Sequence, residues 1–451
     1  MSQSTSRGAS TSSIGMRMSL TPDEKVAFAA RFPVHVGIDT GKSFHKLVAR
    51  GRDGRRTTAL RVDVTRASFE AVDQYLVKTF PDCSRDQILI GIEFAGHHGF
   101  TFVQFVRDMG YTVVGVLPSV TKRLKEIEDN SPRKDDDKDA AQICKLLSSG
   151  LFVGIAQLSE TVAQMRILAG ERHRLAVETT RLKNRLHGAL DLVWPEFAEQ
   201  FSDIAKATPL SVLDNWPLPL DAVNAPLRTV HGVVKKASRN HVGSERVALL
   251  LKTARDTVGV LSAPDARRSE IVRLLARMEL VRSQIAEVEA PLAELVAQHP
   301  AALALTTVPE VSAVCAATLI SELGIPESYV APRQVLKLAG MNLARKESGT
   351  SVRGRVRQTK RGRPLLRRQL FLLAGRWCCS RGLYREDYLA LKSRNGGSKT
   401  SAMCAVARKM VPMLLHIMQT AEAFDEEKWK AGRAVQRIAV QHCVLEGAAA
   451  A

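Results

Sequence analysis

The sequence has few aromatic residues, no paired cysteines and no long uncharged stretch. Aromatic side chains make up 5% of the 451 residues, so a nucleic-acid surface would depend on Arg and Lys more than on stacked rings. The seven cysteines are scattered and include no C-x-x-C pair, which indicates neither a disulfide framework nor a structural zinc site. The sequence contains no run of about 18 uncharged apolar residues, so a membrane-spanning helix is not expected. These absences together favour a protein of a reducing cytoplasm.

Acidic residues are in deficit. The chain has 65 Lys plus Arg against 46 Asp plus Glu, a formal net charge of +19. Such a surplus favours an anionic partner, and without a spanning helix it favours nucleic acid over an acidic membrane surface. Apolar residues at 45% exclude a wholly disordered chain, and the length suggests two or three domains. The Ser- and Thr-rich leader, residues 1–30, is expected to be disordered, and the tail, residues 426–451, carries no distinctive pattern.

Residues 31–157 alternate between strand and helix patterns. The expected strands are 34–39, 45–50, 59–64, 87–93 and 111–117, and the expected helices are 66–79, 97–109 and 135–148. The order β-β-β-α-β-α-β followed by a helix predicts a mixed sheet with helices on its faces. The charged stretch 121–138 contains Pro132 and is expected to be either a mobile loop or the approach to a helix.

Residues 158–299 are predicted to be a helical assembly region resembling a coiled coil. It contains two long helical patterns, 160–193 and 265–298. Apolar residues of the second pattern alternate spacings of three and four, as in a coiled-coil seam: Ile271, Leu274, Met278, Val281, Ile285, Val288, Leu292 and Leu295. Two interpretations stay open, a dimerising coiled coil and an antiparallel hairpin within one chain. Pro291 should kink the second helix near its end. Residues 200–262 show no clear period and receive no assignment.

Residues 300–425 form the expected C-terminal domain, which is mainly α-helical. The turn Val308 to Ser312 precedes an apolar helix at 313–323, a pattern typical of a helix-hairpin-helix, whose turn presents backbone N–H groups to phosphate. That motif normally has glycines where this chain has Glu310 and Ser312. The hairpin is therefore expected, but its grip on DNA is in question.

Acidic residues stand where a sheet would gather them. Asp39 ends the first strand, Glu93 ends the fourth, and Asp136 and Asp139 share one helix face because they are three residues apart. Crowded carboxylates repel one another unless a cation neutralises them, and oxygen ligands suit Mg²⁺ or Mn²⁺. Two such ions can clamp the attacking and leaving oxygens of a phosphodiester. We interpret the four acids as a metal site, and the alternative is a set of solvated surface acids.

A dense basic segment follows the expected hairpin. Between residues 345 and 368 the only acid is Glu347. We expect this segment, together with Lys134, to contact the phosphate backbone, and the alternative is a solvated basic loop. The expected contacts are Lys134, Arg345, Lys346, Arg353, Arg355, Arg357, Lys360, Arg361, Arg363, Arg367 and Arg368.

Three N-terminal motifs resemble the DEDD-type insertion-sequence transposases, bacterial recombinases related to the Piv invertase. They are Asp39 in Gly-Ile-Asp, Glu93 in Ile-Glu-Phe-Ala-Gly, and the run from Lys134 to Ala140, where only Asp136 and Asp139 combine the family's spacing with the following Ala. The resemblance implies a RuvC-like catalytic domain of the RNase H fold. It also implies that the four acids hold Mg²⁺ or Mn²⁺.

C-terminal motifs follow the same family's order: Leu338 to Met341, then Ser348-Gly349, then Lys360 to Arg363. The resemblance implies that Ser348 is a nucleophile that forms a transient phosphoserine bond to DNA, with Ser351 a competing candidate. It further implies a DNA transposase that acts as a homo-oligomer, and some members of the family use a structured non-coding guide RNA. Two rival functions stay open, a RuvC-like junction nuclease that uses water and a non-catalytic nucleic-acid-binding protein.

Overall fold

The computed structural model describes residues 20–93, 96–128, 136–260, 262–344, 347–348, 352–353, 356–379, 381–394 and 396–432. The chain divides into two compact units. The first comprises residues 1–158, 324–338 and 342–354, and the second comprises residues 159–323, 339–341 and 355–451. Each unit has hydrophobic cores of its own.

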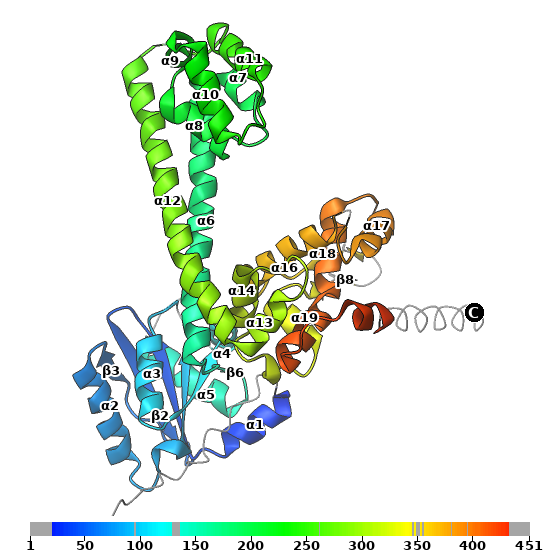
Figure 1. The fold of residues 1–451 in the computed structure, drawn as a ribbon. Helices are drawn as coiled ribbons and strands as arrows, with labels where there is room; N and C mark the ends of the chain where they lie inside the picture. The colour runs from blue at the N-terminus through cyan, green and yellow to red at the C-terminus, as the bar shows by residue number, and fades with distance from the viewer. Residues whose placement is uncertain are drawn as a thin grey trace, which may run out of the picture. The chain divides into compact units, whose positions relative to one another are not determined.

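The first unit is built on a six-stranded mixed sheet (Figure 1). Its strand order is β3 (Leu60–Asp63), β2 (Phe44–Gly51), β1 (Val34–Thr40), β4 (Ile88–Glu93), β5 (Thr112–Val116) and β6 (Val153–Gly154). The first three strands pair antiparallel, β4 and β5 run parallel to β1, and β6 is antiparallel to β5. The predicted mixed sheet is confirmed, with every expected strand in place.

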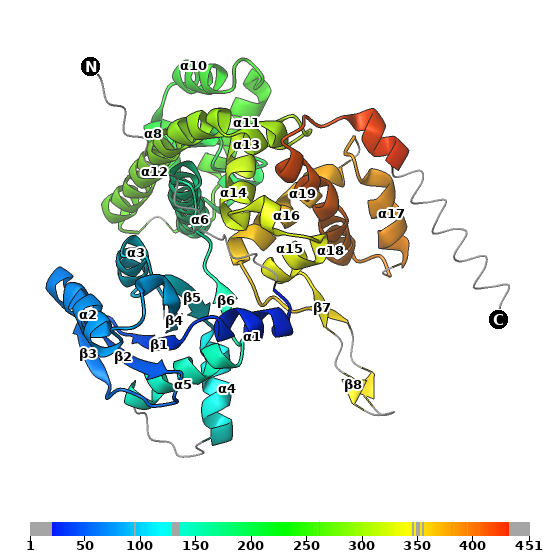
Figure 2. The ribbon, with the colours of Figure 1, turned by 90° about the horizontal axis from the view of Figure 1, so that it is seen from below.

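Helices cover both faces of this sheet (Figure 2). On one face α2 (Arg66–Thr79) and α3 (Phe100–Asp108) bury Ile38, Ile90 and Phe102, each at most 1% exposed. Burying a side chain of this size stabilises the fold by roughly 1.5–3 kcal/mol. On the other face α5 (Asp136–Ser148) packs against β1 and β2. The apolar stripe of α5, formed by Ala140, Ile143, Cys144 and Leu147, is fully buried, which fixes the face that this helix turns toward the sheet.

Two helices lie where the sequence analysis assigned none. Residues 22–30, assigned to a disordered leader, form α1 (Pro22–Ala30), because Thr21 and Glu24 make a capping box and Lys25 Nζ donates to Phe152 O at 2.7 Å. In the charged stretch 121–138, the residues up to Glu128 belong to α4 (Pro118–Glu128), so this part is a helix of its own, which neither alternative predicted. Pro132 and Lys134 lie outside the described residues.

The second unit contains the two long helices, α6 (Glu160–Val193) and α12 (Pro264–Gln298), which lie side by side (Figures 1 and 2). Ser159 caps α6 by accepting from Val162 N at 3.3 Å. The predicted seam of α12 faces α6, with Ile271 and Leu292 fully buried. This is the hairpin interpretation within one chain, and assembly of several copies through these helices stays a prediction. Helix α12 continues through Pro291 to Gln298.

Residues 195–255, most of which the sequence analysis left unassigned, form five helices beside the C-terminus of α6 and the N-terminus of α12. They are α7 (Pro195–Glu199), α8 (Ala207–Asn215), α9 (Pro219–Asn224), α10 (Leu227–Ala237) and α11 (Ser244–Arg255), which we call the cap. Trp194, Phe197 and Trp216 are buried in one core with the adjoining turns of the long helices. Proline and glycine residues divide this stretch into short pieces, and the sequence analysis missed even α10, whose Val230 and Val234 lie on one buried face.

The C-terminal part is mostly helical. The second unit includes α13 (Pro300–Thr306), α14 (Ala313–Leu323), α16 (Pro364–Trp377), α17 (Arg385–Arg394), α18 (Lys399–Lys409) and α19 (Val411–Thr420). The first unit adds α15 (Pro332–Leu338), β7 (Leu343–Ala344), and β8 (Glu347–Ser348), which pairs antiparallel with β9 (Val352–Arg353). Strand β10 is Arg357–Gln358. Among the described residues, Lys399–Thr420 has the length and composition to cross a membrane, but half of its apolar window is buried, as in a core helix.

Candidate catalytic site

Asp39 and Glu93 are direct neighbours in the sheet. Strands β1 and β4 run parallel with Asp39 opposite Glu93, so both carboxylates leave the same edge on the same face. Adjacent strands lie about 4.8 Å apart, which places the two side chains within reach of a shared cation. Both residues are half-buried. The sheet therefore brings together two acids that are 54 positions apart in the chain.

Helix α5 runs antiparallel to β1 on the face that carries these acids. At one end of β1, His35 Nδ1 lies 3.0 Å from Ser148 Oγ, near the end of the helix. Two residues along the strand, a Cβ on Gly37 would collide with Ala140 O and lie 2.9 Å from Cys144 N. Each further step along β1 thus corresponds to an earlier turn of α5. The first turn of α5 therefore lies at the edge where β1 ends with Asp39.

That first turn contains both remaining acids. Asp136 begins the helix, and its side chain lies outside the described residues. Asp139 is 7% exposed and forms an ion pair with Lys125 of α4. A buried carboxylate needs a partner, and here an ammonium group supplies the positive charge. The predicted acids thus come from three elements, of which β1 and β4 end side by side and α5 begins at the same edge of the sheet.

The donor set fits a hard cation, although the described side chains do not include a finished metal cluster. No group of three or more His, Cys, Asp or Glu residues is arranged to hold a metal in the described part of the chain. The carboxylates of Asp39, Glu93 and Asp139 offer oxygen donors only, which suits Mg²⁺ or Mn²⁺ better than Zn²⁺. Lys125 shows that a positive charge is accommodated beside Asp139.

Thr40 and His45 also belong to this edge, and the sequence did not single them out. Thr40 Oγ1 donates to Glu93 O at 2.8 Å, which ties the end of β1 to the end of β4. His45, opposite Thr40 in β2, is 1% exposed and packs between Phe69 and Phe102. Burial lowers the pKa of His45 because the charged imidazolium loses its hydration. The position of Thr40 directly after Asp39 was the available signal.

The basic segment divides into structural and exposed residues. Arg363 Nη1 donates to Glu322 O at 2.8 Å, and Arg367 Nη1 donates to Ala339 O at 2.8 Å. These two guanidinium groups hold the local fold together rather than lying free for phosphate. Arg357, Lys360, Arg361 and Arg368 are exposed. The remaining predicted contacts, Lys134, Arg345, Lys346, Arg353 and Arg355, lie outside the residues whose side chains are described.

The motif around Gly340 has a clear structural purpose. Gly340 has φ 65°, and an added Cβ would lie 2.9 Å from the backbone of Arg361. Lys360 N donates to Gly340 O at 2.9 Å. The glycine thus allows the basic segment to lie against residues 339–341. Ser348 is in β8 and Ser351 follows it, and both side chains lie outside those described.

The helical hairpin expected at residues 300–323 is present, but its turn differs from the phosphate-binding turn of a helix-hairpin-helix motif. Glu310 has φ 66°, in the left-handed region that favours glycine. Val311 N donates within the turn to Val308 O at 3.1 Å. Trp377 Nε1 and Arg376 Nη1 donate to Pro309 O and Glu310 O, at 2.8 and 3.0 Å. The turn is fastened to α16, and it exposes a carboxylate where a phosphate would bind.

Comparison with known proteins matches both halves of this arrangement. A family model for DEDD transposases of the IS110 group, described as transposase, matches residues 36–195. A second, described as transposase of the IS116/IS110/IS902 family, matches residues 302–388. The chain belongs to the IS110 family of transposases. The first match covers the sheet, α5 and α6, and the second covers α13 through the basic segment.

Two relatives extend the likeness of this transposase over most of its length. An uncharacterized 43.6 kDa protein of insertion element IS110 from Streptomyces coelicolor is 25% identical over 407 residues, covering 88% of this chain and 97% of the relative. An uncharacterized 44.8 kDa protein of insertion element IS116 from Streptomyces clavuligerus is 24% identical over 397 residues, covering 87% and 96%. The predicted family and the predicted enzyme class, a DNA transposase, are confirmed. A non-catalytic binding protein is thereby disfavoured.

Proposed function

We propose that this transposase cuts and rejoins the DNA of an insertion sequence at a metal site on a RuvC-like domain of the RNase H fold. The strand order β3-β2-β1-β4-β5, with the first three strands antiparallel and the next two parallel to β1, supports that fold. The single observation that carries the proposal is the register of Asp39 against Glu93 beneath the first turn of α5.

In this proposal Asp39, Glu93, Asp136 and Asp139 hold Mg²⁺ or Mn²⁺. A bound divalent ion polarises a phosphate and lowers the pKa of a hydroxyl beside it. The chain's own residues prepare the site. Thr40 ties the end of β1 to the end of β4, and Lys125 forms an ion pair with the buried Asp139. The Gly37 contact with α5 holds the helix close enough for its acids to join those of the sheet.

Ser348 is the proposed nucleophile. Its hydroxyl gives up a proton as the oxygen attacks the scissile phosphorus, the P–O bond to one deoxyribose breaks, and the departing deoxyribose oxygen takes up a proton to become a hydroxyl. The phosphoserine retains the ester bond, so a second DNA hydroxyl can attack it and release the serine without ATP. The exposed residues Arg357, Lys360, Arg361 and Arg368 would position the DNA backbone.

The assembly and location of the protein are part of the same proposal. Exchange of several strands needs more than one active site, so we infer a homo-oligomer in the bacterial cytoplasm, with the long helices as candidate contacts. A structured non-coding RNA that pairs with donor and target DNA is compatible with the basic charge of +19. The RNA would be identified by sequencing the nucleic acid that copurifies with the protein.

Substitution of the serine tests the covalent step. Ser348→Ala should abolish strand exchange while DNA binding and Mn²⁺ binding persist, and Ser351→Ala should retain exchange. Denaturation of stalled reactions followed by peptide mapping should find the DNA adduct on Ser348. Full strand exchange by Ser348→Ala would refute the covalent mechanism and favour a nuclease that uses water.

Substitution of an acid tests the metal site independently. Asp39→Asn should weaken Mn²⁺ binding measured by electron paramagnetic resonance and should abolish strand exchange. Asp63→Asn, which alters an exposed ion pair with Arg61 on β3, is the matched control and should change neither. Equal Mn²⁺ binding by wild type and Asp39→Asn would contradict the site.

A further inference from the structure

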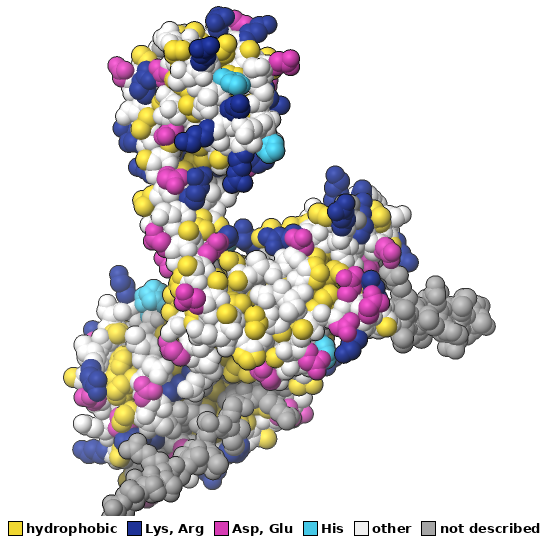
Figure 3. Space-filling view, viewed as in Figure 1, with side chains coloured by type: hydrophobic (Ala, Val, Ile, Leu, Met, Phe, Trp, Pro, Cys, Tyr) yellow, Lys and Arg dark blue, Asp and Glu magenta, His cyan; other side chains and the backbone are white. Residues whose placement is uncertain are grey.

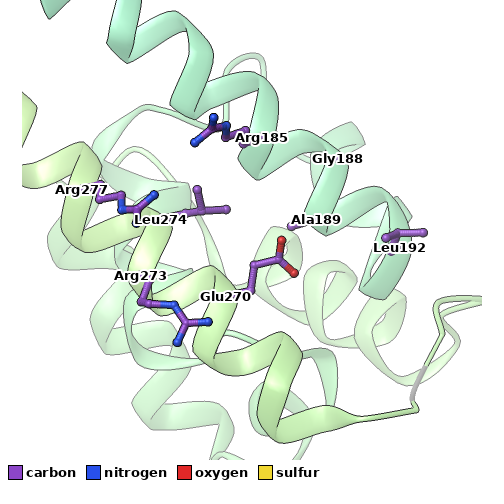
Figure 4. Close-up of a pocket in the computed structure, with 8 residues that line it drawn as sticks. All are labelled: Arg185, Gly188, Ala189, Leu192, Glu270, Arg273, Leu274 and Arg277. Atoms are coloured by element: carbon purple, nitrogen blue, oxygen red, sulfur yellow. The ribbon is translucent and has the colours of Figure 1, made fainter.

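A basic cleft lies between the two long helices near the cap. It has a volume of about 450 Å³ and lies between the last turns of α6 and the first half of α12 (Figure 4). Ala189 and the buried Leu274 form its apolar floor. Arg185 projects from α6, and Arg273 and Arg277 project from α12. Three cations from two elements thus surround one hollow.

These arginines differ from others on the same hairpin because they lack acidic partners among the described residues. Arg181 pairs with Glu178 at 3.5 Å and Arg282 pairs with Glu279 at 2.6 Å. Around the cleft, Arg273 Nη1 donates to the Ser269 hydroxyl at 2.7 Å, which leaves its charge uncompensated. Glu270 extends into the cleft as its lone acid (Figure 4). The lining therefore has a formal charge of +2 (three Arg less one Glu).

The cap adds a small surplus of positive charge, since residues 195–255 contain eight Lys or Arg against six Asp or Glu. Residues 222–244, which include α10, contain no Asp or Glu but carry Arg228, Lys235, Lys236 and Arg239. Val230 and Val234 of α10 pack into the same core as the cleft helices, and the four cations are exposed. Figure 3 shows Lys and Arg side chains over the cap and the adjoining part of the two long helices. The surroundings thus attract an anion rather than neutralise the arginines.

The composition of this region indicates which anion fits. The large aromatic residues Trp194, Phe197 and Trp216 are buried in its core and offer no platform for unpaired bases. Arg273 and Arg277 are separated by about 6 Å along α12, so each can contact a different phosphate of one strand. Regularly spaced phosphates without exposed bases are the surface of a nucleic-acid duplex. Because the protein is a DNA transposase, its substrate is the duplex that this cleft would bind.

We propose that this cleft binds the phosphate backbone of duplex DNA as a second contact, separate from the acidic edge and from residues 345–368. The contact is independent of sequence, because guanidinium groups that reach phosphates do not read bases. It would hold DNA that flanks the cleaved segment. The proposal adds a binding site to the transposase and needs neither the phosphoserine step nor a particular metal.

The test compares two double variants of the full-length protein on the same two helices. Arg185→Gln with Arg277→Gln removes two cleft cations, and Arg181→Gln with Arg282→Gln removes two paired cations and serves as the matched control. Affinity for a labelled DNA duplex is measured by fluorescence anisotropy over a range of KCl concentrations in EDTA. The cleft variant should bind weakly and show a log–log salt slope shallower by about 1.8, at roughly 0.9 per phosphate contact. The control should retain the wild-type slope and affinity.

Further arms make each outcome decisive. Glu270→Gln should raise DNA affinity, because it removes the one acid from the cleft. Equal loss in both double variants would overturn the proposal, since net charge alone would then account for binding. Loss of affinity for an RNA duplex with DNA affinity unchanged would also overturn it. Equal melting temperatures for the two double variants would establish that the difference is not one of folding. Because EDTA prevents metal-dependent catalysis, failure here would leave the proposed strand exchange untouched.

Discussion

Glu310 and Lys125 show how individual side chains shape the two functional regions. Glu310 holds a left-handed conformation in the turn between α13 and α14, where a glycine would be unstrained. Lys125 places an ammonium group against the buried Asp139 at the acidic edge. One residue carries a conformational cost, and the other pairs with a buried carboxylate.

Glu310→Gly should stabilise the transposase. An L-residue in the left-handed region costs roughly 1–2 kcal/mol, and glycine removes this cost. Glycine also gives the unfolded chain more entropy, which offsets part of the gain, so the free energy of unfolding should rise by about 1 kcal/mol. Urea denaturation measures the change. Glu310→Ala retains the strain and should stay near wild type. An equal gain from alanine would attribute the effect to the lost carboxylate instead.

Lys125→Met should destabilise the metal-free protein by about 1–3 kcal/mol, since it leaves a buried carboxylate without a partner. Addition of Mn²⁺ should restore more stability to this variant than to wild type, as followed by thermal melting. Lys122→Met is the control on the same helix, because Lys122 makes only an exposed pair with Glu126 at 4.0 Å. Similar behaviour of both variants would argue against a cation site at Asp139.

At the scale of elements, long periodic segments were predictable and short or contact-dependent ones were not. The helices expected at 66–79 and 160–193 match α2 and α6 at both ends, because each has an apolar stripe and a hydroxyl N-cap at Thr65 or Ser159. The cap helices are short and separated by proline and glycine, and the sequence analysis did not resolve them. How closely α5 approaches β1 depends on Gly37, whose importance appears only once the helix lies on the strand.

Gly37→Ala should impair strand exchange although Gly37 has no side chain to take part in chemistry. Its Cβ would collide with Ala140 O, so α5 must move away from β1 and carry Asp136 and Asp139 from the sheet acids. We expect weaker Mn²⁺ binding and a loss of stability of several kcal/mol, of the order seen for overpacked cores. The control is Gly232→Ala on α10, where an added Cβ meets nothing within 4 Å, and it should stabilise the protein slightly. Unchanged Mn²⁺ binding in a folded Gly37→Ala protein would refute the linkage.

Asp73→Asn should loosen α2 from the sheet in a pH-dependent way. Asp73 accepts from Arg85 Nε at 2.7 Å and from the Tyr111 hydroxyl at 2.8 Å, and the hydrogen bond from Arg85 chiefly lowers the pKa of Asp73. A lowered folded pKa gives stability that is complete above the ordinary carboxyl pKa and is lost as pH falls through the folded value. Wild type should therefore exceed the variant by about 1–2 kcal/mol at neutral pH and lose this advantage in acid. Urea unfolding at several pH values measures it, and a constant difference would contradict the mechanism.

Over the whole molecule, the basic residues behind the net charge of +19 have different structural roles. Arg363 and Arg367 donate to backbone carbonyls, while Arg357, Lys360 and Arg361 are exposed. The cleft arginines lie on the hairpin, far along the chain from this segment. Net charge predicts affinity for nucleic acid, but only the hydrogen bonds tell structural cations from those available to DNA.

The triple variant Arg357→Gln, Lys360→Gln, Arg361→Gln should bind DNA with a salt slope shallower by about 2.7, at roughly 0.9 per phosphate contact, and should melt like wild type. Arg367→Gln should instead lower the stability of the protein and leave the salt slope of DNA binding almost unchanged. It leaves Ala339 O without its donor and should lower the free energy of unfolding by about 1–3 kcal/mol, with little change of slope. Anisotropy titrations and thermal melts distinguish the two, and matching slopes for both variants would contradict the division of duties.

The sequence alone determined the order of strands and long helices and pointed to four candidate acids, because apolar periodicity and motif spacing are local properties of the chain. The tertiary structure decided which residues meet. It set Asp39 opposite Glu93, turned α12 onto α6 of the same chain, and paired Lys125 with Asp139. It also separated the structural arginines from the exposed ones and formed the basic cleft near the cap. Contacts between distant residues depend on how elements pack, and no local pattern in the chain records that packing.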